Sequence, residues 1–262
     1  MAMQRRLAAA FFVAFLPVLT NVATAQSGPV RDLTSKDRAY LEKLLGKGVI
    51  GEPLPAAPIP PMQQHVEKWL GREAIRKCVH GPDKGKEILS KLDRLKRDGT
   101  GLAWRLDTGG RTVLYGQFDS DGSMKRHSVD DREEGVLTQY APPVPLFVPG
   151  YAAGQKAEVE TKIKVFDLAN PTKQEHSGKM KVTTEYLGRF RVKVPAGTFE
   201  TIGMKWTYKG KVGPANVEDQ SYWFFNLESG PIVWVNKLDV SAFLVYQDHS
   251  KRASVLARFV EE

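Results

Sequence analysis

The stretch Met204-Lys205-Trp206-Thr207-Tyr208-Lys209 alternates large apolar side chains with polar ones. Successive side chains of a β-strand point to opposite faces, so this period of two is typical of a strand with one face in a core. Residues 159–165 and 186–194 alternate in the same way, and turn sequences such as 107–110 and 119–122 separate such runs. Short alternating strands with a turn about every ten residues predict an antiparallel meander.

We therefore expect a mainly β chain, a meander curled into a barrel or half-barrel, with a short N-terminal helix. Parallel βαβ units are excluded because no amphipathic helix separates the strands. For the helix, Thr34 and Asp37 form a capping-box pattern, and Gly46 is a stop after an apolar face. Residues 62–98 contain both a helical leucine spacing and a strong turn at 81–85, and we favour a hairpin there.

The N-terminus has the pattern of an export signal. Arg5 and Arg6 precede an apolar run at 7–19, which is followed by Ala23-Thr24-Ala25. This order predicts a signal peptide cleaved before Gln26, with an uncleaved membrane anchor as the alternative. The expected organisation is a signal peptide (1–25), a short helix and Pro-rich strap (26–61), and an antiparallel β domain (62–262). The expected location is the periplasm.

The 262 residues contain 42% hydrophobic side chains and carry a formal net charge of +8, an ordinary globular composition. The single cysteine, Cys78, excludes a disulfide framework within the chain. Cys78 is either a buried, inert side chain, which we favour, or a reactive thiol. The five histidines lack metal-binding spacing, and nucleophile-elbow, P-loop and dinucleotide motifs are missing. We therefore expect no cofactor or metal and assign no catalytic residue.

The segment Val194-Pro195-Ala196-Gly197-Thr198-Phe199 is the most distinctive of the chain, and the aromatic strand 221–225 and the turn 229–231 follow it. In this order it resembles a family of exported bacterial domains of unknown function, over roughly residues 100–240. The shared motifs are structural. The resemblance implies a periplasmic β-sheet domain that handles lipid or glycan, and it provides no catalytic residue to transfer.

Aromatic side chains mark one candidate site. Alternation directs Tyr222 and Phe224 to one face of their strand and Trp223 and Phe225 to the other, so both faces need cover. Either the concave side holds a ligand cavity or the N-terminal helix plugs it. The candidate ligand-binding residues are Trp206, Tyr208, Tyr222, Phe224 and Trp234.

Positive charge marks the second candidate site. Residues 179–211 contain eight basic side chains and two acidic ones. Such strands form either a face that contacts an anionic surface or a face kept soluble by lysine and arginine. The candidate contact residues are Arg189, Arg191, Lys193, Lys205 and Lys209.

These patterns favour a non-enzymatic periplasmic binding protein for an apolar or amphipathic envelope molecule, a lipid or glycolipid. The partners expected are that ligand and an anionic membrane surface or envelope protein, and not nucleic acid. The alternative is a structural or assembly factor of the envelope that acts through a protein partner. A hydrolase of envelope polymer, using Asp130, Asp131, Glu133 or Glu134, is the third hypothesis.

Overall fold

The computed structural model describes residues 28–95, 103–242 and 246–260. The predicted signal peptide lies outside these residues, and the expected domain boundaries stay a prediction. Within the described part, no helix is long and apolar enough to cross a membrane. The elements are helices α1 (Ser35–Leu45) and α2 (Gln63–Trp69) and strands β1 (Ile50–Leu54), β2 (Glu73–His80), β3 (Glu87–Arg94), β4 (Trp104–Asp107), β5 (Thr112–Phe118), β6 (Met124–Asp131), β7 (Val136–Phe147), β8 (Lys156–Asp167), β9 (Gln174–Val194), β10 (Gly197–Val212), β11 (Ala215–Asn226), β12 (Gly230–Ala242) and β13 (Tyr246–Phe259).

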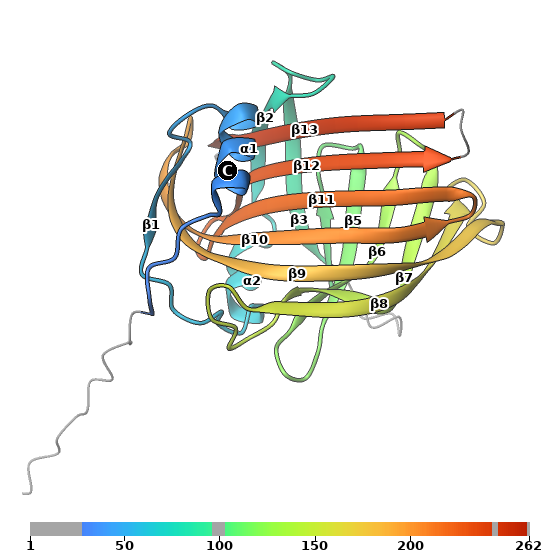
Figure 1. Cartoon of the computed structure of the whole chain (residues 1–262), viewed down its shortest axis with the longest axis horizontal. Helices are drawn as coiled ribbons and strands as arrows, with labels where there is room; N and C mark the ends of the chain where they lie inside the picture. Colours follow the sequence, from blue (N-terminus) through green and yellow to red (C-terminus); the bar gives the residue numbers. More distant parts are fainter. Residues whose placement is uncertain (1–27, 96–102, 243–245, 261–262) are drawn as a thin grey trace, which may run out of the picture.

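The strands form a closed antiparallel barrel (Figure 1). Each strand from β2 to β13 pairs with the next one in sequence, and β13 pairs back with β2, which closes the ring. The short β1 joins the outer edge of β9 beyond the end of β8. Closure leaves twelve strands without a free edge, which removes the exposed pairing groups that an open sheet presents. The predicted meander and barrel are confirmed.

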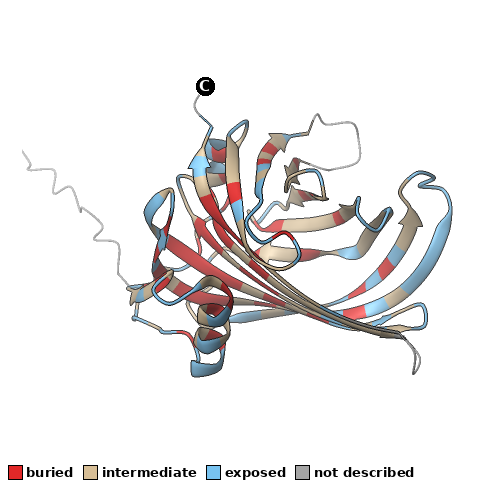
Figure 2. Cartoon of the chain, turned by 90° about the horizontal axis from the view of Figure 1, so that it is seen from above, coloured by how far each residue is buried: buried red, intermediate tan, exposed pale blue. Residues whose placement is uncertain are grey.

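The barrel wall separates two hydrophobic cores. The inner core fills the lumen and is closed at one end by α2 and the strap before it; it includes Ile59, Met62, Trp69, Trp104, Phe147, Trp206 and Phe225. The outer core lies between the outside of the sheet and α1 and β1; it includes Leu41, Leu44, Phe190, Val192, Tyr222 and Phe224. Figure 2 shows buried residues gathered on the part of the sheet beside α1. Both faces of the long strands are therefore covered, each by a different element.

A β-bulge in β9 changes which side chains face the lumen. Gly203 of β10 pairs with Gly188, but its neighbour Met204 pairs with Tyr186, so Leu187 is an extra residue. Before the bulge, even-numbered residues such as Val182 lie in the inner core; after it, even-numbered residues such as Phe190 lie in the outer core. One inserted residue reverses the alternation of the remaining strand.

The N-terminal elements agree with several predictions. The side chain of Thr34 caps α1 by accepting a hydrogen bond from the Asp37 backbone N–H (3.1 Å), as the capping pattern predicted. Within 62–95, the structure has α2 and then the β2–β3 hairpin around the predicted turn, so the favoured hairpin is confirmed after one short helix; residues 96–98 of this segment lie outside the described residues. The Pro-rich strap contributes β1 and then buries Ile59 at the α2 end of the lumen.

Candidate functional site

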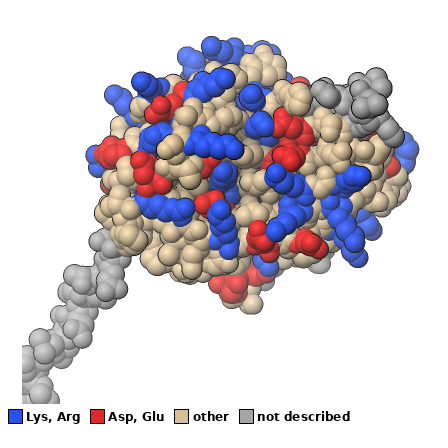
Figure 3. All heavy atoms as spheres, viewed as in Figure 1, with Lys and Arg blue, Asp and Glu red and all other residues tan. Residues whose placement is uncertain are grey.

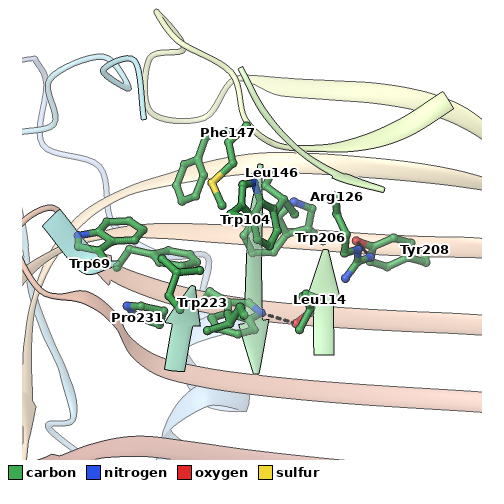
Figure 4. A pocket seen from close by; sticks show the side chains of 15 residues that line it. Trp69, Trp104, Leu114, Arg126, Leu146, Phe147, Trp206, Tyr208, Trp223 and Pro231 are labelled. Atoms are coloured by element: carbon green, nitrogen blue, oxygen red, sulfur yellow. Dashed lines mark hydrogen bonds between the residues drawn. The ribbon is translucent and has the colours of Figure 1, made fainter. Parts of the chain in front are cut away.

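The lumen encloses a cavity of about 50 Å³ between α2 and the middle of the barrel (Figure 4). Side chains from α2 and from eight strands meet there, because closure of the ring directs one face of every strand inward. The lining is almost entirely apolar and aromatic, with Arg126 and Ser221 as its polar members. The aromatic lining residues are Trp69, Trp104, Phe147, Trp206, Tyr208, Trp223 and Phe225.

The end of the cavity next to α2 is a stack of aromatic rings. Phe225 lies between Trp69 (6.0 Å between ring centroids, 11° between planes) and Trp223 (5.5 Å, 7°). The ring of Phe147 meets Phe225 edge-on at 5.0 Å. Such offset and edge-on pairs are the favourable aromatic geometries, and they give this end of the lumen an apolar wall.

Three of the four indole N–H groups that line the cavity donate hydrogen bonds, and the fourth has no partner among the described residues. Trp69 donates to the Leu227 carbonyl (3.0 Å), Trp206 to the Pro145 carbonyl (3.1 Å), and Trp223 to the Ser221 hydroxyl (3.1 Å). Trp104 is 1% exposed, and its Nε1 has no hydrogen-bond partner among the described residues. A buried donor without a partner is costly, so this group is available to an acceptor that enters the cavity.

A positively charged side chain, Arg126, lies at the other end of the cavity. The Arg126 guanidinium of β6 lies 5.0 Å from the ring centroids of both Tyr140 and Tyr208, and it donates a hydrogen bond to the Tyr208 hydroxyl. Its Nε atom is buried and has no partner among the described residues. Burial raises the pKa of Tyr208 above its ordinary value, so this hydroxyl remains neutral.

A carboxylate lies in the same part of the lumen. Asp219 is directly opposite Tyr208 across β10 and β11, and it accepts a hydrogen bond from the Asn236 amide (2.5 Å). Burial raises the pKa of Asp219 to about 6, against the lowering effect of the Arg126 charge and of the hydrogen bonds. Asp219 and Arg126 are not among the ion pairs of the described residues. The guanidinium charge is therefore not neutralised by direct contact.

The lumen thus changes character along the barrel axis. Following β10 away from α2, the inward residues are Ile202, Met204, Trp206 and then Tyr208, and their partners on β11 change from Phe225 to Asp219. Side chains at the α2 end are buried, whereas Tyr140 and Asp219 are half-buried. An aromatic, closed end therefore leads to a polar, more accessible end that carries the cation.

The predicted ligand-binding residues separate into two groups. Trp206 and Tyr208 line the cavity, and Trp234 lies directly across from Trp223 on the same inner face, with ring centroids 6.1 Å apart. Tyr222 and Phe224 do not join them: both are 0% exposed in the outer core beneath α1. The five candidates therefore do not share one lining, because Tyr222 and Phe224 alternate with the lumen-facing residues of β11. The helix covers them from outside and does not plug the lumen.

The predicted basic face is also divided. The β9 bulge places Arg189, Arg191 and Lys193 on the face opposite to that of Lys205 and Lys209, so the five do not form one surface. Figure 3 shows basic and acidic side chains interspersed over the viewed face.

Four of these five basic residues are also neutralised by ion pairs. The pairs are Arg189 with Glu200 (2.6 Å), Arg191 with Glu52 (2.6 Å), Lys205 with Asp37 (2.7 Å) and Lys209 with Glu218 (3.1 Å). Lys205 is moreover mostly buried beneath α1. These residues are therefore poor candidates for contact with an anionic surface.

Unpaired positive charge gathers instead near the end of the barrel far from α2. Lys179 of β9 lies directly between Lys162 of β8 and Lys211 of β10, and Lys164 follows on the same face of β8. These four residues, the lysine row, line a surface groove of about 610 Å³. None of them belongs to an ion pair of the described residues. Like charges directly opposite on neighbouring strands destabilise a sheet, so the row is held at an energetic cost.

The acidic residues of the hydrolase hypothesis lie at and beside the β6–β7 turn. Asp130 accepts a hydrogen bond from the Tyr115 hydroxyl (2.8 Å), and Glu133 pairs with Arg111 (3.4 Å) and Arg252 (2.9 Å). The Asp131 carboxylate accepts hydrogen bonds from backbone N–H groups of the turn. These contacts give the cluster a structural role. Over the described ranges, no group of three or more histidine, cysteine or acidic side chains is placed to hold a metal ion.

Cys78 lies on β2, half-buried. Burial raises the pKa of its thiol, with a further contribution from the Asp83 charge, and nearby cations only partly offset this. A raised pKa lowers the thiolate fraction and with it the reactivity of the thiol.

No family model matches this chain, and a search of curated proteins finds no match. Among solved structures, it is similar to an exported protein with a YmcC-like fold from Bacteroides fragilis NCTC 9343: 14% identity, TM-score 0.41, over 73% of this chain and 96% of that one. A lipoprotein from Parabacteroides distasonis ATCC 8503 shares 11% identity (TM-score 0.36, 73% and 95% coverage). The lipoprotein YmcC of Escherichia coli K12 shares 8% identity (TM-score 0.36, 88% and 98% coverage).

Proposed function

We propose that this protein is a non-enzymatic periplasmic binding module for an amphipathic envelope molecule, a lipid or glycolipid, held in the barrel lumen. The observation that supports it most is the polarity gradient of the lumen, from the aromatic stack at Trp69 and Phe225 to Arg126. An amphipathic molecule has the same gradient along its own length. Apolar walls with a few convergent polar groups are typical of small-molecule sites.

The volume of the cavity limits how much of such a ligand it can hold. Its volume is about 50 Å³, far below the roughly 300–1,000 Å³ of a pocket that encloses a whole ligand. It therefore accepts only a short apolar segment between Trp69 and Arg126, both of which line it, and a longer chain enters only if the side chains of the lumen move apart. Trp104, whose indole N–H has no partner among the described residues, lines the same cavity.

Filling the cavity tests this function. Native mass spectrometry of the protein purified from its own periplasm should reveal a bound lipid-sized mass. Leu114→Trp adds an indole ring to the cavity wall and should abolish that mass. Leu89→Trp makes the same change at a side chain that is 45% exposed on the outside and should retain it. Equal retention by both variants, or a wild-type protein that binds no added envelope lipid, rejects the proposal.

The lysine row favours a second role, docking of the far end of the barrel on an anionic membrane surface. Lysines near such a surface each contribute about 1 kcal/mol of attraction at moderate salt. Replacing all four with Gln should abolish sedimentation with phosphatidylcholine vesicles that contain phosphatidylglycerol. The matched control replaces four ion-paired lysines, Lys68, Lys173, Lys181 and Lys209. Equal binding to pure phosphatidylcholine vesicles contradicts this role.

A further inference from the structure

The Arg126 guanidinium has no directly paired counter-ion inside the barrel, although the nearby Asp219 carboxylate attracts it from beyond ion-pair distance. It belongs to no ion pair of the described residues, and the rings of Tyr140 and Tyr208 flank it at 5.0 Å. Cation–π contacts of this kind offset part of the cost of removing a charge from water, but they do not neutralise it. The arginine is thus held in place with a charge that no described group in contact with it neutralises.

The same guanidinium has unused hydrogen-bond donors. Its Nε is buried and unpartnered within the described chain, and the hydrogen bond from Nη2 goes to the neutral Tyr208 hydroxyl. Arginine presents five N–H donors in a planar fork that matches the oxygens of a carboxylate or phosphate. The fork lies where the aromatic part of the cavity ends, so an acceptor there would sit at the head of a chain inserted toward Trp69.

The Asp219 carboxylate repels an anion near Arg126, but it does not itself accept hydrogen bonds from the Arg126 guanidinium. Its carboxylate is held by the Asn236 amide, and it forms no ion pair with Arg126. An incoming anion therefore gains the attraction of Arg126 and meets repulsion from Asp219 whenever that carboxylate is ionised. The two residues should consequently affect the binding of an anion in opposite directions.

We infer that the ligand of the lumen has an anionic head, a carboxylate or a phosphate, bound by Arg126. This inference rests on the proposed function and adds to it the chemistry of the head. Arg126, Tyr140, Tyr208 and Asp219 then form the head site, and the aromatic rings form the chain site.

A pair of probes that differ in charge alone tests the head site. cis-Parinaric acid is a slender fluorescent chain with a carboxylate, and its methyl ester is the same chain without the charge. The acid should bind wild-type protein more tightly than the ester. Arg126→Gln should weaken binding of the acid by roughly 10- to 100-fold, the range expected for a charged hydrogen bond, and leave the ester unchanged.

Two further variants complete the design. Asp219→Asn should strengthen binding of the acid and not of the ester, because it removes a like charge. The matched control is Arg105→Gln. Arg105 follows Trp104 in β4 and forms an ion pair with Asp107 (3.0 Å), so its replacement should change the affinity of neither probe. Displacement of the acid probe by oleate, by oleoyl lysophosphatidate and by neutral monoolein then distinguishes a carboxylate head from a phosphate head.

The outcomes separate the inference from the function on which it rests. Equal affinities for acid and ester in the wild type, or an Arg126→Gln variant that loses both alike while folded, overturn the anionic head and leave the chain site standing. Failure of both probes to bind rejects the lumen as a site for slender chains and the head site with it. If Arg126→Gln does not fold, the acid-to-ester ratios of wild type and Asp219→Asn decide.

Discussion

Replacing Asp37 with Asn should release α1 from the outside of the barrel. The Asp37 side chain is 8% exposed and accepts hydrogen bonds from the Lys205 ammonium (2.7 Å) and the Tyr222 hydroxyl (2.5 Å). These partners lie on β10 and β11, so one carboxylate connects the first helix to two strands more than 160 residues away in sequence. In the Asp37→Asn variant the Lys205 charge would be left beneath the helix without a counter-ion.

The size of the effect follows from this burial. Removing one partner of a buried ion pair costs about 3–5 kcal/mol, because the other charge stays desolvated. The Lys205 side chain is 18% exposed and regains some water, so we expect a loss near the lower value, about 3 kcal/mol. Burial by itself raises the pKa of Asp37, but the hydrogen bonds from Lys205 and Tyr222 and the Lys205 charge outweigh it, so the pKa is lowered. A lowered pKa means that this stabilisation is present above the ordinary value of 3.8 and is lost as pH falls below it.

Hydrogen exchange measures this loss where it occurs. A loss of about 3 kcal/mol in local stability should speed exchange of the α1 amides by about 100-fold. The central amides of β10 and β11 should change much less, since the barrel pairing is not altered. The double variant Asp37→Asn, Lys205→Met removes the stranded charge and should restore most of the protection.

Glu200→Gln is the matched control, because it breaks an ion pair that is exposed on both sides. It should cost at most about 1 kcal/mol. The reasoning is refuted if Asp37→Asn and Glu200→Gln have equal effects on α1 exchange. It is also refuted if the effects of Asp37→Asn and Lys205→Met simply add in the double variant, since two residues that act as a pair must be coupled.

Three further predictions concern the barrel itself. A Cβ at Gly116 would overlap the ring of Trp104 and the Lys125 carbonyl oxygen, so Gly116→Ala should lower the urea midpoint by an amount equivalent to about 2–3 kcal/mol. The pKa of Asp219 is raised from 3.8 to about 6, so wild-type stability should fall as pH rises from 4 to 6. The Asp219→Asn variant should then be about 3 kcal/mol more stable than wild type at pH 7 and have nearly the same stability at pH 4. Lys179→Glu replaces two like-charge contacts of the lysine row with attractive ones, and should raise the melting temperature by an amount equivalent to about 1 kcal/mol in low salt and much less in 1 M NaCl. A Lys179→Glu protein that is less stable than wild type in low salt would contradict the predicted repulsion.

Local patterns were sufficient for the class of fold. Alternation around Trp206 and the turns between strands are properties of a few neighbouring residues. Each strand can therefore be predicted from its own residues, without knowledge of the other strands. The N-terminus of α1 could be predicted equally well from the sequence, because the cap joins Thr34 to a residue three positions away. Alternation also separated Trp223 from Phe224 correctly, but it could not say which of the two faces α1 would cover.

The basic residues show where local reading fails within a single strand. Alternation in β9 is correct on each side of Leu187, yet the extra residue reverses the faces between the two halves. A bulge exists only relative to a partner strand, so the register with β10 had to be known first. The ion pairs of Arg189 and Arg191 depend on that register and on β1 as well.

The sequence alone therefore determined that the chain forms antiparallel strands, an N-terminal helix and two aromatic faces on β11, because these depend on neighbours along the chain. The tertiary structure decided the candidate site. Arg126 meets Tyr208 across 82 residues, and Trp69 meets Phe225 from a helix that precedes the barrel. The spacing of residues along the sequence does not predict such contacts between distant residues. They arise when the pairing of β13 with β2 closes the ring and brings the inward faces of distant strands around one lumen.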